Sequence, residues 1–255
     1  MNLISKSKKN HHAYFNRDIS WLQFNARVLQ EAEDPTVPLL ERLRFLGIFS
    51  NNLDEFFKVR YATIKRIVEA GKEGKSELGG VAASDLMEKI TQTVIDHQQQ
   101  SMNILRDIES QLEKEDIYII NETEITPDQS KFISEYFIRV VSPALVTIML
   151  TEVDEFPSLK DSVAYLAVRM VMQEKDETFQ SKINYALIEI PRYVDRFVEL
   201  PEKEGKKYII ILDDLIRHCL GNIFSIFYYE SISAHMIKIT RDAELDLDSD
   251  LSRSF

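Results

Sequence analysis

Apolar side chains recur at steps of three and four residues through most of the first 115 positions. That spacing places them on one face of a helix. It predicts helices over about residues 18–34, 38–50, 53–67 and 84–114. We expect Asp18 or Ser20 to cap the first helix, and Asp34 to end it because Pro35 follows. The pattern therefore predicts an all-helical region at the start of the chain.

The pattern changes after Asp116. Short runs rich in β-branched and aromatic residues predict strands at residues 117–120, 162–172, 183–191, 207–212 and 231–240. The second and third of these runs flank a polar stretch, so we expect a hairpin with a long loop. Two helices interrupt the strands, one opening at the TPDQ run and one capped by Asp213 or Asp214. This part is predicted to be α+β with a mainly antiparallel sheet.

These patterns predict two domains. Residues 1–115 form a helical N-terminal domain, in which the polar residues 1–13 are expected to be mobile. Residues 116–255 form an α+β domain. We expect this second domain to be truncated at its C-terminal end, because the last residues look like the start of a helix that stops at Phe255 without a cap.

Composition narrows the class of protein. The chain has 255 residues, 44% of them hydrophobic, which is enough for a sizeable core. Its net charge of −11 argues against broad nucleic-acid binding, which needs a basic face. Cys219 is the single cysteine, so an internal disulfide is excluded. No apolar run is long enough for a transmembrane segment and no secretion signal precedes the first helix, so we expect a cytoplasmic protein.

Candidate catalytic residues are few. His97 lies on an apolar helical face, His218 on an amphipathic helix and His235 on a strand, and no nucleophile–base set is recognisable around them. Cys219 follows His218 directly, but neighbouring helical residues point about 100° apart. The run GKEGKS resembles the end of a phosphate-binding loop, yet Glu69 stands where that motif needs a glycine. We therefore assign no catalytic residue.

The run FLGIFSNNLDEFFKVR places two asparagines between two apolar helical stretches. Asparagine is a poor helix-interior residue, so Asn51 and Asn52 predict a corner between two helices. Asp54 and Glu55 would then begin the second helix, where the macrodipole favours acids, or would hold a metal. An alternative for Asn52 is a contact to a nucleotide base, because an amide offers both a donor and an acceptor.

Residues 18–60, DISWLQFNARVLQEAEDPTVPLLERLRFLGIFSNNLDEFFKVR, and the later KITRDAE at 238–244 resemble bacterial polyphosphate kinases of the large, histidine-phosphorylating type. The resemblance covers nearly the whole chain. It implies an N-terminal helical domain and a head domain used in dimer contacts. In that family the phosphorylated histidine and the magnesium ligands lie in later, phospholipase D-like domains, and this sequence stops before them. The resemblance assigns one ligand-binding residue to this chain. It is Asn52, which matches the ATP contact of the family.

The resemblance implies an enzyme that reversibly transfers the γ-phosphate of ATP to polyphosphate through a phosphohistidine. This chain would position ATP through Asn52 and contribute to a homodimer, with ATP or ADP and polyphosphate as ligands and Mg²⁺ held by domains outside it. The location implied is the cytoplasm, with the inner-membrane periphery as an alternative. Nearby Arg42, Arg44, Lys58 and Arg60 are expected to form surface ion pairs. The competing hypothesis is a stand-alone, non-catalytic helical scaffold or interaction module.

Overall fold

The computed structural model describes residues 16–71, 82–150, 155–173 and 183–241. The predicted fold class is confirmed, since a helical N-terminal region is followed by an α+β region with a mainly antiparallel sheet. The chain divides into two compact units, one up to Arg106 and one covering Asp107–Arg241. Each unit is described by itself below.

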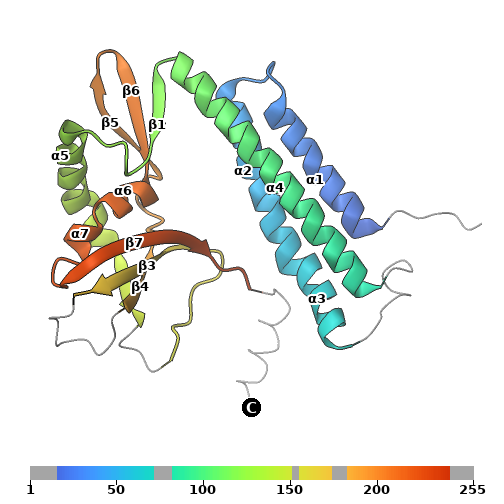
Figure 1. Cartoon of the computed structure of the whole chain (residues 1–255). Coiled ribbons are helices and arrows are strands. Elements are labelled where there is room, and N and C mark those ends of the chain that lie inside the picture. Colours follow the sequence, from blue (N-terminus) through green and yellow to red (C-terminus); the bar gives the residue numbers. More distant parts are fainter. Residues whose placement is uncertain (1–15, 72–81, 151–154, 174–182, 242–255) are drawn as a thin grey trace, which may run out of the picture. The chain divides into compact units, whose positions relative to one another are not determined.

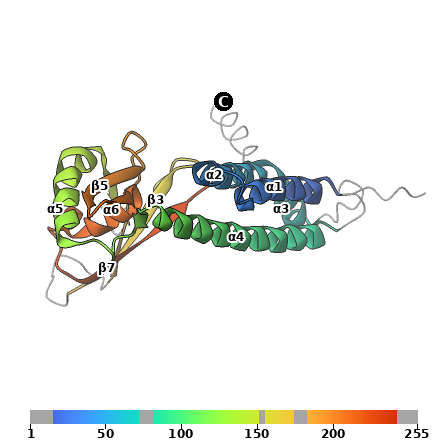
Figure 2. The ribbon, with the colours of Figure 1, turned by 90° about the horizontal axis from the view of Figure 1, so that it is seen from above.

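The first unit is built from helices that run side by side (Figures 1 and 2). These are α1 (Arg17–Glu33), α2 (Leu39–Phe56), a π-helical turn η1 (Phe57–Tyr61), α3 (Ala62–Glu69) and α4 (Ala83–Lys114). Their buried side chains follow the predicted helical spacing, and burying each large one contributes roughly 1.5–3 kcal/mol. The buried set includes Leu22, Leu29, Phe49, Leu53, Phe56, Ile64, Leu86, Ile90, Val94 and Ile104.

The predicted cap of α1 is wrong. Asn16 caps the helix, and its Oδ1 accepts hydrogen bonds from the backbone N–H groups of Asp18 at 2.9 Å and Ile19 at 3.2 Å. Asp18 is buried inside the first turn, and Ser20 bonds back to the Asn16 carbonyl. An asparagine two residues before Asp18 therefore satisfies the free helical N–H groups.

The second unit contains two sheets. The larger has the order β2-β4-β3-β7 and is antiparallel throughout, and the smaller has the order β1-β6-β5, in which β1 and β6 are parallel. The predicted hairpin is confirmed, with Val168 opposite Ala186. The strands are β1 (Ile117–Ile120), β2 (Val146–Met149), β3 (Ala164–Met172), β4 (Ile183–Glu189), β5 (Phe197–Lys203), β6 (Lys206–Ile211) and β7 (Tyr229–Lys238).

Helices complete this second unit. They are α5 (Pro127–Tyr136), the π turn η2 (Phe137–Val141), the 3-10 turn η3 (Ser142–Ala144), α6 (Leu212–His218) and α7 (Leu220–Ile223). Thr126 and Gln129 form a capping box at the start of α5. The predicted aspartate cap of α6 is wrong, because Ile211 precedes the helix without a side-chain cap. One hydrophobic core joins both sheets with α5, α6 and α7.

Some expectations cannot be compared with the structure. The segments concerned lie outside the described residues. They are residues 1–13, most of the loop with the GKEGKS run, the turn of the β3–β4 hairpin and the tail after Arg241.

Candidate functional site

The helices α1 and α2 pack against each other in antiparallel register. At one end, Arg60 donates from Nε to Oδ1 of buried Asp18 at 2.8 Å. About one helical turn further along α1, the rings of Trp21 and Phe56 stack with centroids 4.9 Å apart. These two contacts fix the seam between the helices, and they place the next turn of α1 beside the asparagine pair of α2.

Two side-chain amides bridge the seam at that next turn. Asn25 of α1 is completely buried, and its Nδ2 donates to the backbone carbonyl of Phe49 at 3.2 Å. Asn52 donates from its own Nδ2 to Oδ1 of Asn25 at 2.9 Å. We call these three hydrogen-bonded groups, the Phe49 carbonyl and the side chains of Asn25 and Asn52, the amide relay. Within the described residues, Oδ1 of half-buried Asn52 takes part in no hydrogen bond.

The relay corrects the predicted corner. Asn51 and Asn52 lie inside a continuous α2, and Asp54 and Glu55 belong to its last turns instead of opening a new helix. The physical reason is that Asn52 bonds across the seam to another side chain, so its amide does not compete for the helical backbone. Asn51 is exposed and needs no partner.

Two neighbouring arginine side chains make different kinds of contact. Arg44 forms the predicted exposed ion pair, with Nη1 2.6 Å from Oε1 of Glu41. Arg42 departs from the prediction, because it is buried and its Nε donates to the Ala32 carbonyl at 2.6 Å. Arg42 thus ties the end of α1 to the start of α2.

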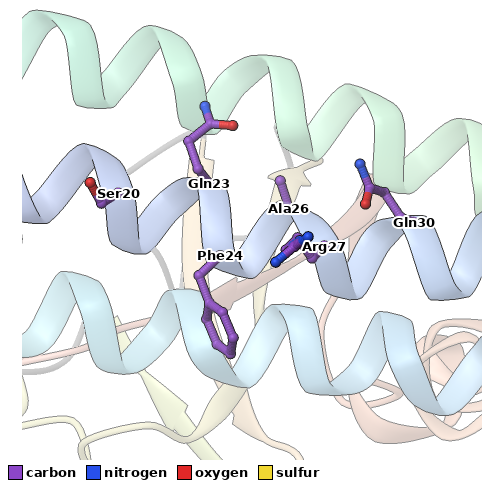
Figure 3. A pocket seen from close by; sticks show the side chains of 6 residues that line it. All are labelled: Ser20, Gln23, Phe24, Ala26, Arg27 and Gln30. Atoms are coloured by element: carbon purple, nitrogen blue, oxygen red, sulfur yellow. The ribbon is translucent and has the colours of Figure 1, made fainter. Parts of the chain in front are cut away.

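An open hollow lies along the exposed side of α1 (Figure 3). Its volume is about 410 Å³. Figure 3 shows Gln23 leaving α1 toward α4 and Phe24 leaving it toward α2. The lining is polar except for Phe24 and Ala26, and it comprises Ser20, Gln23, Phe24, Ala26, Arg27 and Gln30.

The second unit holds a compact charged cluster at the start of α6. Arg217 pairs with Asp214, with Asp213 at 3.3 Å and with Glu122 at 3.5 Å. Burial raises the pKa of the Asp214 carboxyl to about 6; Arg217 opposes this rise, while Asp213 and Glu122 add to it. The predicted capping acids of α6 therefore bind arginine side chains, which explains the absent cap.

The histidines and the cysteine do not assemble a catalytic set. His97 lies edge-on to Phe49, and burial lowers the pKa of its imidazole. His218 shares a 2.8 Å hydrogen bond from Nε2 to the Ser130 hydroxyl, with no acid bonded to the ring among the described residues. Burial raises the pKa of the Cys219 thiol to about 12, so the thiolate is disfavoured.

Two further properties concern the described part of the chain alone. No three metal-ligating side chains of the histidine, cysteine or acidic type gather closely enough there to hold an ion. None of the helices described combines the length and the apolarity that a bilayer crossing requires.

Comparison with known proteins identifies the family. The family model described as the polyphosphate kinase N-terminal domain matches residues 14–120, and the one described as the polyphosphate kinase middle domain matches residues 128–255. Because the second match alone covers half of the chain, the chain belongs to the polyphosphate kinase family.

Individual relatives agree with this membership. The chain is 41% identical over 246 residues to the polyphosphate kinase of Vibrio vulnificus and 37% identical over 246 residues to that of Escherichia coli. Each alignment covers 94% of this chain and 34% of the relative. The crystal structure of polyphosphate kinase from Porphyromonas gingivalis matches with a TM-score of 0.77 at 31% identity, over 92% of this chain and 34% of that one. The chain thus spans about a third of the relatives it matches.

Asn52 was predicted from the sequence, whereas Asn25 of the amide relay and the adjacent Phe24 were not. Asn52 came from the resemblance. Asn25 does have a recognisable pattern in the sequence, since it is a polar residue between Leu22 and Leu29 on the buried stripe of α1. Nothing in the sequence indicated that the ring of Phe24 would be exposed, and in the structure it is 62% exposed.

Proposed function

We propose that this chain forms the ATP-positioning part of an enzyme that reversibly transfers the γ-phosphate of ATP to polyphosphate. Membership of the polyphosphate kinase family supports the reaction. The observation that supports ATP positioning by this chain is the hydrogen bonding of the Asn52 side-chain amide. It is held on one side by Asn25 and leaves an oxygen without a hydrogen bond among the described residues. A fixed neutral amide with a free acceptor suits the edge of a nucleotide base.

The reaction proceeds through a phosphohistidine supplied by parts of the enzyme beyond this chain. A histidine nitrogen attacks the γ-phosphorus, the bond to the ADP oxygen breaks, and a terminal polyphosphate oxygen then displaces the histidine. Mg²⁺ would neutralise phosphate charge in such a transfer. The described residues offer no cluster to hold the ion, so we assign no step to it in this chain.

Three assignments complete the proposal. Residues 1–115 act as the nucleotide-facing helical domain and residues 116–255 as a head domain. The head domain contributes to a homodimer of the enzyme. The enzyme works in the cytoplasm, where ATP is available as substrate.

The test uses the protein as expressed from its natural reading frame, captured with an antibody to this chain. It is incubated with γ-labelled ATP and run on a denaturing gel without acid treatment. We expect a labelled band far heavier than the 29.7 kDa of this chain, with a label that mild acid removes and added polyphosphate accepts. An unlabelled band at 29.7 kDa would instead mean a free-standing scaffold or interaction module.

A further inference from the structure

The larger sheet of the second unit has one face in the hydrophobic core and one face that is covered only in part. Its strands β4, β3 and β7 lie side by side (Figure 1). On β3, Leu166 and Val168 belong to the core. Because side chains alternate along a strand, the residues between them belong to the outer face. At one end this outer face is covered, since Leu159 packs there with Tyr165 and Leu187.

The other end of the outer face is exposed and consists of polar side chains. Tyr185, Arg169 and Ser233 are opposite one another on β4, β3 and β7, and all three are exposed. Ser231 and His235 lie two residues to either side of Ser233 on β7 and are exposed as well. Directly opposite side chains on neighbouring strands have Cβ atoms about 5 Å apart, and diagonal ones about 7–8 Å. We call these five residues the donor face.

The donor face combines hydrogen-bond donors with a cation. Each of its five side chains has at least one donor group, and the Arg169 guanidinium has five N–H groups. Within the part of the chain that the structure describes, none of these side chains takes part in an ion pair or a hydrogen bond. The neighbouring acids are elsewhere, since Glu189 is paired with Lys160 at the covered end, and Glu230 precedes Ser231 and so alternates to the other face.

Such a surface fits a linear phosphate chain. Phosphate oxygens are acceptors, and a guanidinium binds them with two parallel charge-assisted hydrogen bonds. A row of donors about 5 Å apart across three strands lets one extended anion contact several of them at once. Single-stranded RNA is the competing polyanion, but sheets that bind RNA stack two or three bases on aromatic side chains. The donor face has one aromatic ring, that of Tyr185, so a phosphate chain without bases fits it better.

We propose that the donor face binds polyphosphate, with Arg169 pairing with its phosphate groups and the hydroxyl of Tyr185 donating a further hydrogen bond. This inference rests on the proposed function and adds to it a polyphosphate-binding surface on the second unit.

The experiment measures kcat and KM for polyphosphate in the transfer of phosphate to ADP, using the enzyme expressed from its natural reading frame. The variants are Arg169→Gln, Arg169→Lys and Tyr185→Phe. Arg139→Gln is the matched control, because Arg139 is an exposed arginine of η2 in the same unit. Circular dichroism reports whether each variant is folded, and KM for ADP reports on the nucleotide site.

We expect Arg169→Gln to raise KM for polyphosphate about tenfold with kcat within about twofold, because charge-assisted hydrogen bonds are lost. Arg169→Lys should raise it by about threefold, since lysine keeps the charge without the planar fork. Tyr185→Phe should raise it by about threefold through the lost hydroxyl. Added salt should weaken polyphosphate binding more in the unmutated enzyme than in Arg169→Gln. Arg139→Gln should leave KM for polyphosphate unchanged, and no variant should change KM for ADP.

Three results would overturn the inference. The first is an unchanged KM for polyphosphate in folded Arg169→Gln, and the second is an equal rise in Arg139→Gln, which would indicate a general effect of charge. The third is binding of a labelled single-stranded RNA that Arg169→Gln abolishes while KM for polyphosphate stays unchanged. Failure of the unmutated enzyme to use polyphosphate would refute the proposed function, whereas an active enzyme insensitive to Arg169→Gln would refute this inference alone.

Discussion

The side chain of Asn52 donates a 2.9 Å hydrogen bond to Oδ1 of Asn25, a residue 27 positions earlier and completely buried. Asparagine in a helix interior is less favourable than alanine by up to about 0.7 kcal/mol. A hydrogen bond to a buried partner contributes about 1 kcal/mol, which offsets that cost. The bond therefore lets α2 continue through the asparagine pair, and it fixes the direction of the amide that we assign to ATP.

The ion pair between Asp18 and Arg60 predicts a stability effect. Asp18→Asn should lower the free energy of unfolding by about 2 kcal/mol, because a charge-assisted hydrogen bond to a buried carboxylate is lost. Urea unfolding followed by circular dichroism measures the change. Arg44→Ala serves as the control, since the exposed pair of Arg44 with Glu41 contributes about 0–1 kcal/mol. Equal effects of the two substitutions would contradict the role given to Asp18.

Replacing Asn184 on β4 is expected to raise the free energy of unfolding, in contrast to Asp18→Asn. Its side chain is completely buried, and neither amide atom has a hydrogen-bond partner among the described residues. Asn184→Leu should raise the free energy of unfolding by about 1–2 kcal/mol, because an unsatisfied polar group is replaced by an apolar one of similar volume. The exposed Asn103 of α4 gives the control Asn103→Leu, expected to change stability by less than about 0.5 kcal/mol. A loss of stability in Asn184→Leu would show that the amide is bonded.

How far the sequence predicted the fold depended on the range of the interactions involved. The bounds of α1 and α4 were predicted to within one or two residues, because a helical period repeated over many turns is a strong local signal. The strand β5 was missed. It contains Pro201, which is tolerated because β5 is an edge strand of its sheet. Edge position is a property of the assembled sheet and has no local signal.

The continuity of α2 likewise could not be predicted from local sequence, because it depends on a contact to another helix. Local propensity favours a break at Asn51 and Asn52, and the compensating partner is Asn25 on another helix. Likewise, the aspartates at the start of α6 look like caps until the arginines that bind them are known. Residue patterns therefore located the elements, whereas the tertiary contacts decided what each polar side chain does.

The charged cluster at α6 predicts a pH dependence. The pKa of the Asp214 carboxyl is raised to about 6 in the folded protein, from 3.8 for an unperturbed aspartate. The folded state therefore binds more protons than the unfolded state between about pH 4 and 6, and this group destabilises the fold as pH rises through that window. Urea unfolding from pH 4 to 7.5 should show this fall in the wild type relative to Asp214→Asn. Parallel curves for the two proteins would contradict the assignment.

The central claim is that Asn52 contacts the ATP base, and its neighbour provides the control. Asn52→Ala and Asn51→Ala remove the same amide from adjacent positions of α2, but only Asn52 belongs to the relay. The measurement is the KM for ATP of the enzyme expressed from its natural reading frame. We predict a rise of about tenfold for Asn52→Ala, the usual size of a lost hydrogen-bond pair to a base, and no change for Asn51→Ala. An unchanged KM in folded Asn52→Ala, or an equal rise in both variants, would contradict the claim.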